Sequence, residues 1–538
     1  MRVKLHLLIF LFLPFGAFSQ VEDALVFFAD KENVTAALAN PISILSQEAI
    51  DRKMLHGTPI DERDVPLNEE YKNIVSNQLG ITVLAKSKWM NAIYVQGEKS
   101  NIENLLNLDF VSEIEFMNKN FNRSVSLRII DDKFEIEESR IIYNYGTAQN
   151  QTEMIAVDAL HNRGYNGEGI RVAFMDNGYP NVLNNPAYAE LRDENRLLGS
   201  YDFVSRTTNA DGSGNHGALT FSNAAAYLEG QFKGTAPKAM YYLFITEDGN
   251  QESPIEEAYW LEALERADSL GVYITNTSLG YQDFDNSGYD YSYSDLDDET
   301  TIGARAANHA FDKGMLNVVS AGNSGQTFGY VASPAHSSGA LAVGAVDSNG
   351  NYASFSSFGP TYDGRIKPDI MAQGVDAATI DENGNLASAN GTSLSAPIIT
   401  GAIASLWSVA PELTNNQIMQ IVRESAHLYN NPTEEMGYGI PDFSQALDAL
   451  EQLGIEDLKQ EHYFALYPNP IDTEVFISFP KDIDFATFQL YDVLGKTLLH
   501  KNISSSHNKV EVSHLKSGVY FVLLTANNTS TRFKIVKK

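Results

Sequence analysis

The stretch Asn390-Gly391-Thr392-Ser393-Leu394-Ser395-Ala396-Pro397 places one serine between a turn of small residues and the start of an apolar helix. A helix N-terminus has unpaired backbone N–H groups and a partial positive charge, which stabilise an alkoxide and the oxyanion that forms when the alkoxide attacks a carbonyl. Pro397 is tolerated within a first helical turn, and the apolar residues from Ile398 to Leu406 continue the pattern of a buried helix. Ser393 is therefore a candidate nucleophile.

A serine hydroxyl is unreactive near neutral pH, so a histidine must remove its proton and an acid must hold that histidine. The segment from Ile170 to Gly178 predicts a short buried strand that ends in Asp176, at the edge where open parallel sheets bind ligands. His216 follows a loop of small polar residues and opens the run from Ala218 to Leu228, which predicts a helix. Taken singly, such residues are more often helix caps, turn formers or surface groups. Together they indicate a catalytic set.

The chain order Asp176, His216, Ser393 is the order found in subtilisin. From about Gly164 to Ala449 the chain resembles the subtilisin-like serine peptidases, or subtilases. The matching blocks are, in order, Ile170 to Gly178, Asn215-His216-Gly217, Ser320-Ala321-Gly322-Asn323-Ser324-Gly325 and Gly391 to Pro397. Lesser matches are Gly234-Thr235-Ala236-Pro237, Ser278-Leu279-Gly280, Phe355-Ser356-Ser357-Phe358-Gly359-Pro360 and Lys367-Pro368-Asp369. The resemblance implies an α/β fold, a subtilisin-like parallel sheet with helices on both faces.

The resemblance also implies a role for each residue. His216 would act as general base and then general acid, and Asp176 would orient it and stabilise the imidazolium. Asn323 would offer its side-chain amide to the oxyanion, beside the backbone N–H of Ser393. The implied substrate-binding residues are Ser278, Leu279 and Gly280, an edge that pairs with substrate backbone, and Ser320, Ala321 and Gly322, a second wall of the primary specificity pocket. The implied activity is that of a serine endopeptidase that hydrolyses proteins or peptides through an acyl-enzyme.

Two positions depart from the family pattern. Subtilases usually carry Ser or Thr after the catalytic Asp and Thr after His-Gly, where this chain has Asn177 and Ala218. An inactive subtilase scaffold that acts as a surface binding or adhesion protein is therefore the alternative to an enzyme. An esterase of the α/β-hydrolase type is disfavoured, because the serine motif is Gly-x-Ser-x-Ser and because the acid and the base precede the nucleophile.

Composition and the N-terminus narrow the location and the partners. The net charge of −31 would repel phosphates, which argues against a nucleic-acid partner. The 538 residues contain no Cys, so disulfides, thiolate metal sites and a cysteine nucleophile are excluded. Residues 1–19 have the pattern of a signal peptide, with Arg2 and Lys4 before an apolar run from Leu7 to Phe18 and cleavage expected before Gln20. The run is shorter than the ~20 residues that span a bilayer, and we expect no transmembrane segment elsewhere.

Residues 20–117 predict a small α+β domain. The predicted strands are Ala24–Phe28, Ile81–Ala85, Ala92–Gln96 and Val111–Phe116, and the predicted helix is Lys99–Leu106. Placed before a subtilase domain, this unit resembles the inhibitory propeptide of the family, whose C-terminal end occupies the active site until it is cut. An unrelated accessory domain is the alternative. Residues 118–150 are the predicted processing and linker region, and the peptidase domain is predicted at 151–450.

An acidic, tyrosine-rich segment runs from Asp283 to Thr300. Positions of a calcium-binding loop are matched by Asp283, Asp285, Ser287 and Gly288, but Ser294 stands where such a loop needs a bidentate Glu. The segment therefore predicts a solvated loop at the rim of the substrate cleft. The implied chemistry requires no cofactor. Because many subtilases bind calcium elsewhere, a structural calcium ion without named ligands stays an open expectation.

Residues 451–463 predict a linker and residues 464–538 a small β-sandwich. The predicted strands are Val475–Phe479, Thr487–Tyr491, Val510–Val512, Val519–Thr525 and Arg532–Val536. The motifs Leu466-Tyr467-Pro468-Asn469-Pro470 and Leu515-Lys516-Ser517-Gly518-Val519-Tyr520, with the basic end Lys534–Lys538, resemble the C-terminal sorting domain of type IX secretion cargo in Gram-negative bacteria. That resemblance implies the type IX secretion machinery as a partner and a secreted or cell-surface location. A carbohydrate-binding sandwich is the alternative.

Overall fold

The computed structural model describes residues 21–119, 146–452 and, apart from 468–470, 472, 480–482, 493–495, 507 and 527–528, residues 465–537. The predicted signal peptide lies outside the described residues, as do most of the predicted processing region and of the predicted linker. The chain divides into two compact units, residues 1–447 and 448–538. No helix among the described residues is long and apolar enough to cross a bilayer.

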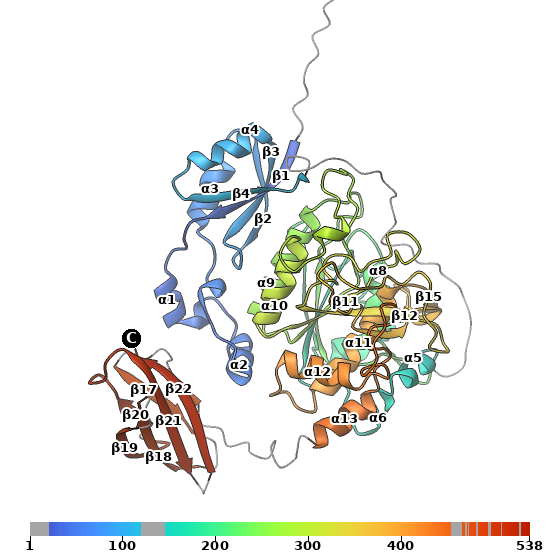
Figure 1. Ribbon diagram of the computed structural model, residues 1–538. Helices are drawn as coiled ribbons and strands as arrows, with labels where there is room; N and C mark the ends of the chain where they lie inside the picture. Colours follow the sequence, from blue (N-terminus) through green and yellow to red (C-terminus); the bar gives the residue numbers. More distant parts are fainter. Residues whose placement is uncertain are drawn as a thin grey trace, which may run out of the picture. The chain divides into compact units, whose positions relative to one another are not determined.

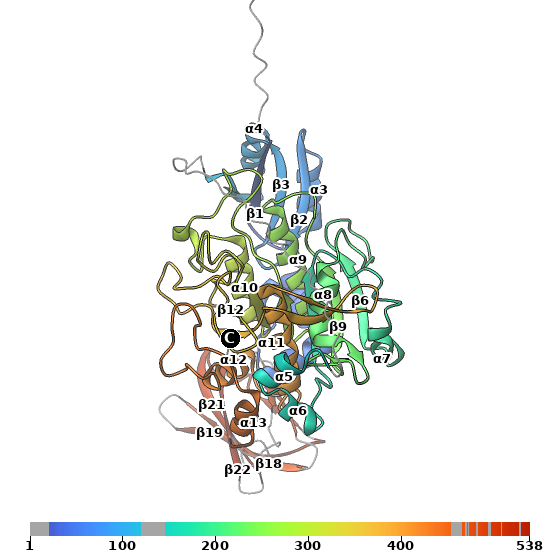
Figure 2. The ribbon, with the colours of Figure 1, turned by 90° about the vertical axis from the view of Figure 1, so that its right-hand side faces the viewer.

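A seven-stranded parallel sheet forms the centre of the first unit, in the order β13-β12-β11-β10-β5-β9-β6. Its strands are β5 (Arg171–Asp176), β6 (Leu197–Asp202), β9 (Met240–Ile245), β10 (Ile274–Thr277), β11 (Leu316–Ser320), β12 (Ala340–Val346) and β13 (Ile370–Gln373). Figure 2 shows β6 and β12 toward opposite sides of this sheet. After β9 the chain crosses to β10 on the other side of β5, so the ends of β5 and β10 form a topological switch point, where α/β sheets bind ligands.

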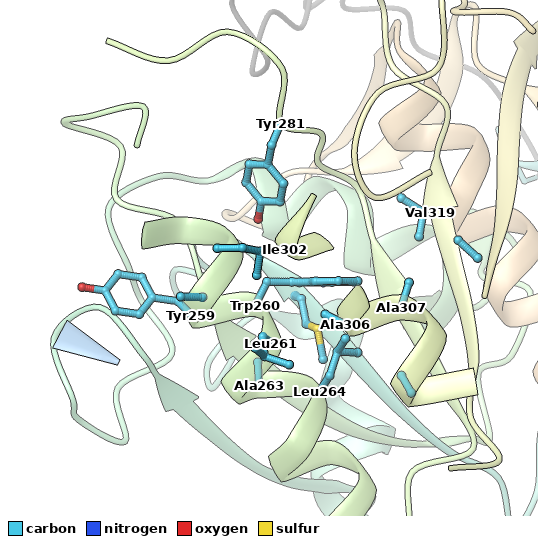
Figure 3. Close-up of a cluster of buried hydrophobic side chains, with 14 of the residues drawn as sticks. Tyr259, Trp260, Leu261, Ala263, Leu264, Tyr281, Ile302, Ala306, Ala307 and Val319 are labelled. Carbon is cyan, nitrogen blue, oxygen red and sulfur yellow. The ribbon is translucent and has the colours of Figure 1, made fainter. Parts of the chain in front are cut away.

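Helices cover both faces of the sheet. Helices α8 (His216–Ala225) and α11 (Thr392–Trp407) lie against one face, and α9 (Ile255–Ser269) and α10 (Ile302–Asp312) lie against the other (Figure 1). Phe174 of β5 packs against Phe221 of α8, with ring centroids 5.2 Å apart, whereas Met175 belongs to the cluster around Trp260 of α9 (Figure 3). A strand buried on both faces needs apolar residues on both sides, which is why the interior of β5, Val172 to Met175, is an unbroken apolar run.

The remaining elements of this α/β domain lie at its periphery. They are α5 (Gln149–Met154), α6 (Asp158–Asn162), α7 (Ala189–Asp193), α12 (Asn415–Glu424), α13 (Phe443–Gln452), the short pair β7 (Tyr227–Leu228) and β8 (Phe232–Lys233), and the hairpin β14 (Ala377–Ile380) and β15 (Leu386–Ala389). Two single turns of 3-10 helix are Pro186–Tyr188 and Tyr293–Asp295.

The N-terminal domain is a four-stranded antiparallel sheet in the order β2-β3-β1-β4. Its strands are β1 (Val21–Phe28), β2 (Ile81–Ser87), β3 (Ala92–Glu98) and β4 (Val111–Phe116), and its helices are α1 (Val34–Ala39), α2 (Gln47–His56), α3 (Glu69–Ser76) and α4 (Lys99–Glu103), the last continued by a 3-10 turn at Asn104–Asn107. The sequence predicted the strands and the α4 region but missed the helical segment after β1. We call residues 29–68 of that segment the arm; it also contains 3-10 turns at Pro41–Ser43 and Glu62–Asp64.

The arm contacts the α/β domain through buried ions. Arg52 and Lys53 of α2 pair with Asp268, near the end of α9, and Lys53 Nζ lies 2.8 Å from Oδ1 of Asp268. Asp64 of the arm pairs with Lys313, which follows α10, at 2.7 Å. All five side chains are at most 1 % exposed. The charges of Lys53 and Arg52 hold the pKa of Asp268 below its ordinary value, although burial works in the opposite direction.

The sheet of the N-terminal domain reaches the same pair of helices by a different contact. The carboxylate of Glu265 on α9 accepts hydrogen bonds from the Ser87 hydroxyl at 2.6 Å and from the backbone N–H groups of Lys88 and Trp89, both at 2.9 Å. Trp89 is buried in the hydrophobic cluster around Trp260. The N-terminal domain therefore contacts α9 and α10 in three ways: through apolar side chains around Trp89, through the turn at Ser87–Trp89 that Glu265 caps, and through the charged arm.

The second unit is a β-sandwich. One sheet has the order β16-β17-β20 and the other β19-β18-β21-β22. The strands are β16 (Ala465–Tyr467), β17 (Glu474–Ser478), β18 (Phe485–Tyr491), β19 (Thr497–Ser504), β20 (Lys509–Glu511), β21 (Gly518–Ala526) and β22 (Thr529–Lys537). Alternate residues of both sheets share one core, for example Val475 and Ile477 with Phe488 and Leu490. The sequence predicted five of these strands and missed β16 and β19, because β16 is very short and β19 mixes His, Lys and Asn into its pattern.

Candidate active site

The acid and the histidine that the sequence singles out lie side by side. Asp176 is the last residue of β5 and is fully buried, and His216 is the first residue of α8. Nδ1 of His216 lies 2.7 Å from Oδ1 of Asp176, which also accepts the N–H of Asn177 at 2.8 Å. A Cβ on Gly217 would lie 2.9 Å from Cβ of Asp176 and 2.4 Å from the Gly178 carbonyl oxygen. Only glycine lets α8 begin this close to β5.

Thr220 completes the surroundings of the acid. Its hydroxyl donates to Oδ2 of Asp176 at 3.1 Å. Thr220 lies one helical turn after His216, so α8 presents both side chains to the same carboxylate. The two family departures, Asn177 and Ala218, lack a hydroxyl, and the hydroxyl that contacts Asp176 here comes from Thr220. The i, i+4 spacing from His216 was the signal in the sequence that could have identified it.

Ser393 is the second residue of α11 and is 4 % exposed. Pro397 is the sixth residue of this helix and lies in its second turn, not in the first turn as the sequence analysis expected. A proline has no N–H, so the Ser393 carbonyl four residues earlier has no helical donor. The hydroxyl of Ser278, directly after β10, donates to that carbonyl oxygen at 2.9 Å. Pro397 thereby leaves the Ser393 carbonyl oxygen available to Ser278, and this hydrogen bond holds the start of α11 against the end of β10.

Asn323 lies in the loop after β11, and its orientation is set by Thr392. Oδ1 of Asn323 accepts hydrogen bonds from the backbone N–H and the hydroxyl of Thr392, both at 2.9 Å. The amide nitrogen of Asn323 therefore points away from Thr392. A Cβ on Gly391, whose φ is +144°, would lie 2.9 Å from Ser393 Oγ and 3.5 Å from Asn323 Nδ2. The serine hydroxyl and the asparagine amide thus border the same small space, which a side chain at position 391 would fill.

A pocket opens beside Ser393 and Asn323. Of the residues expected to bind substrate, those that line the pocket are Ser278, Leu279, Gly280, Ser320 and Gly322. Ala321 lies behind them, fully buried, and donates its N–H to the Val343 carbonyl at 2.9 Å. Its side chain belongs to the hydrophobic cluster around Trp260.

The segment from Asp283 to Thr300 is solvated only in part, whereas its acidic composition predicted a solvated loop. Tyr289 is 4 % exposed and Tyr291 is 7 % exposed, because their rings are covered by the N-terminal domain and α9. The Tyr289 hydroxyl donates to Asp23 of β1 at 2.8 Å, and the Tyr291 hydroxyl donates to Glu257 of α9 at 2.5 Å. Burial raises the pKa of Glu257, against the lowering effect of its hydrogen bonds from Tyr291, Ser333 and the Gly303 N–H. The described residues hold no group of three or more His, Asp or Glu side chains placed to bind a metal ion.

The fold is that of a subtilisin-like α/β domain, with a parallel seven-stranded sheet and helices on both faces. Residues 123–439, more than half of the chain, match the model of the Subtilase family, and the chain belongs to that family. Residues 23–131 match the Peptidase S8 propeptide domain of Bacteroidota, and residues 465–538 match the Secretion system C-terminal sorting domain.

Relatives match about half of the chain. The thermostable alkaline protease of Halalkalibacterium halodurans is 31% identical over 281 residues, which are 52% of this chain and 68% of that protein. Subtilisin Savinase of Lederbergia lenta is 30% identical over 278 residues, 51% of this chain and 88% of its own length. Among solved structures, the MycP3 protease from the type VII (ESX-3) secretion system matches with a TM-score of 0.45 and 20% identity, over 58% of this chain and 93% of that one.

The chain is therefore a subtilisin-like serine endopeptidase with a propeptide domain. Its C-terminal sorting domain links it to type IX secretion and indicates a secreted or cell-surface location. Both assignments agree with the expectations drawn from the sequence motifs.

Proposed function

We propose that the protein cleaves peptide bonds through an acyl-enzyme formed on Ser393, with His216 as base and acid and Asp176 as the group that holds His216. The observation that carries this proposal is the 2.7 Å contact between Asp176 and His216, at the switch point to which Ser278 ties the turn that bears Ser393. The carboxylate, buried and bonded to Thr220, keeps the imidazole in one orientation and stabilises its protonated form.

The reaction proceeds in two halves. Nε2 of His216 accepts the proton of Ser393 as the oxygen bonds to the scissile carbonyl carbon, and the carbonyl π electrons move onto its oxygen. When the tetrahedral intermediate collapses, the C–N bond breaks and the leaving amine takes the proton from His216. A water molecule then attacks the ester by the same route and restores Ser393.

The oxyanion of each tetrahedral intermediate is stabilised by Nδ2 of Asn323 and by the backbone N–H of Ser393. Thr392 holds the amide in place before substrate arrives, so little reorganisation is needed when the charge develops. In subtilisin, removal of one such side-chain donor lowers turnover by about 100- to 1000-fold. All of these groups belong to the protein chain, so the proposed steps need no cofactor, and any bound calcium would be structural.

The flanking regions have proposed roles in delivery and control. Residues 1–19 direct export across the inner membrane, residues 20–117 inhibit the peptidase until a cut within residues 118–150, and residues 464–538 direct the chain through the type IX machinery. Residues 451–463 would link the peptidase domain, 151–450, to this sorting domain. The proposed substrates are proteins or peptides outside the cell.

An active-site fluorophosphonate tests the proposal. The processed wild-type protein should be labelled on Ser393, and Ser393→Ala, refolded in the same way and checked by circular dichroism, should not be labelled. A folded wild-type protein that takes up no label and cleaves no peptide would instead favour the inactive binding scaffold.

A further inference from the structure

The pocket beside Ser393 is acidic. Glu252 and Asp283 line the same pocket as Ser393 and Asn323. None of the described residues that line it is Lys, Arg or His, and its other lining residues are small, amide or apolar. Both carboxylate-bearing residues are partly exposed, so the pocket presents two acids to a bound peptide in an environment less polar than water.

The two acids stand on loops that are fixed before any substrate binds. The backbone N–H of Glu252 donates to the Asp285 carboxylate at 3.1 Å, and the N–H of Asp285 donates to the Glu252 carbonyl at 2.9 Å, so the two loops are tied together. Tyr281, two residues before Asp283, donates its N–H to the Ser333 carbonyl at 2.7 Å. Its side chain, labelled in Figure 3, is 1 % exposed. Charges held on such loops lose little conformational entropy when a ligand binds.

The pocket lies on the acyl side of the scissile bond. In the proposed reaction His216 must hand a proton to the leaving amine, so the part of the substrate after the scissile bond faces His216. Ser393 and Asn323 line the pocket, whereas His216 and Asp176 do not. A peptide that pairs with the Ser278–Gly280 edge therefore directs side chains that precede the scissile bond toward Glu252 and Asp283.

The neighbouring loop already binds a cation of this chain. Lys119, which follows the last strand of the N-terminal domain, donates from Nζ to the Asp295 carboxylate at 2.9 Å and to the Asp290 carbonyl at 3.2 Å. Its ammonium group lies 3.9 Å from the centre of the Tyr291 ring. In sequence, Lys119 opens a stretch up to Ile130 that contains Arg123 and Arg128 and no acid, in a chain whose net charge is −31.

We propose that this pocket selects substrates with a basic side chain, Arg or Lys, on the acyl side of the scissile bond, and that Glu252 and Asp283 are the residues that select it. This inference rests on the proposed function, because it assigns a substrate class to the same site. The basic stretch that begins at Lys119 has the composition such a pocket would accept.

Peptide pairs test the selection. The full chain, after processing, is given internally quenched peptides that are identical except for Arg or Gln at each of the four positions before the scissile bond. At one or more of these positions kcat/KM for Arg should exceed that for Gln by about tenfold or more, and the advantage should shrink with added NaCl because the ions are partly solvated.

Variants assign the preference to its residues. Glu252→Gln and Asp283→Asn should each lower the Arg-to-Gln ratio by several-fold, measured against the same enzyme's rate on the Gln peptide. Glu299→Gln, an exposed acid of the same loop outside the pocket, should leave the ratio unchanged. Equal rates on Arg and Gln peptides, or a ratio that survives both substitutions, would overturn the inference while peptide cleavage and Ser393 labelling uphold the proposed function. Absence of all cleavage and labelling would overturn both.

Discussion

The active site and the arm interface both bury charged side chains, but they do so in different ways. Asp176 and His216 are enclosed by elements of one domain: the two side chains contact each other, and Asp176 also accepts a hydrogen bond from Thr220 of α8. Arg52, Lys53 and Asp268 are buried only because the arm and the α/β domain cover each other. The first arrangement is permanent, whereas the second depends on two domains that a zymogen must eventually separate.

Because the arm interface is ionic, the N-terminal domain can separate from the α/β domain more easily than across an apolar interface. Burying an ion pair costs several kcal/mol of desolvation per ion, and the attraction between the ions roughly offsets this cost. When the domains part, each ion regains its hydration, so a charged interface resists separation less than an apolar interface of the same area. Removal of one partner has a much larger effect, because the remaining charge stays buried without compensation.

The largest expected effect is a loss of activity when the buried acid of the active site is removed. Asp176→Ala should lower kcat on a peptide substrate by about 10⁴-fold, because the imidazole loses the group that orients it and stabilises its charge. The variant is processed in trans by tagged wild-type enzyme, which is removed before the assay. The arm interface is untouched, so most of the change should appear in kcat. A loss of less than tenfold would show that Asp176 does not support His216 in catalysis.

The next largest effect is a loss of stability when the buried acid of the arm interface is removed. In the Ser393→Ala background, Asp268→Asn should lower the free energy of unfolding by about 3–5 kcal/mol, because Arg52 stays buried without its carboxylate and Lys53 keeps only Asp64, 3.4 Å away. Urea unfolding of the first unit, followed by tryptophan fluorescence, measures this. Glu69→Gln is the matched control, since Glu69 pairs with Lys72 and Lys86 at an exposed site and its loss should cost about 1 kcal/mol or less. Equal costs for the two substitutions would contradict the role assigned to the cluster.

The same contrast explains what the sequence could and could not predict. The strand that ends in Asp176 and the helix that begins at His216 were predictable, because their residues form local patterns that match their buried environment. Helix α2 reverses the usual pattern: it buries Arg52 and Lys53, while Met54 is 62% exposed and Leu55 is 48% exposed. Its partners lie more than 200 residues away, and nothing local distinguishes such charges from ordinary surface groups.

Within the site, the proposed reacting groups could be picked out from short motifs, whereas the groups that position them were missed. Only Thr220 left a signal in the sequence, its i, i+4 spacing from His216. Thr220 and Thr392 act on Asp176 and Asn323 through contacts that depend on how α8 and α11 approach the sheet. The buried tyrosines of the 283–300 segment were hidden for the same reason. Their polar neighbours in sequence suggest solvent, and only the covering domain makes these two rings part of a core.

Thr220→Val is a smaller change in the active site, and it tests whether the hydroxyl that donates to Asp176 supports catalysis. The substitution keeps the shape of the side chain and removes the hydroxyl that donates to Asp176, so kcat should fall by about 10- to 100-fold, as expected for a hydrogen bond to a charged group. KM should change little, because Thr220 does not line the pocket. Thr220→Ser restores the donor and should recover most of the rate. An unchanged kcat in Thr220→Val would mean that the backbone N–H of Asn177 and the His216 contact are sufficient.

The smallest expected effect is a pH dependence at the domain interface. Burial raises the pKa of Glu265 to about 7, against the lowering effects of Lys88 and of its three hydrogen bonds. An exposed Glu in the unfolded chain titrates near pH 4.3. Between these two values the unfolded chain releases a proton that the folded chain keeps, so this group lowers stability as pH rises through the window. In the Ser393→Ala background, Glu265→Gln removes the titration but keeps an acceptor for Ser87. Its Tm relative to the parent should therefore rise by about 1–3 °C between pH 4.5 and pH 7.5, measured by calorimetry. A Tm difference that stays constant with pH would mean that the three donors hold Glu265 ionised throughout, and the capped turn would then resemble the arm in relying on a buried charge.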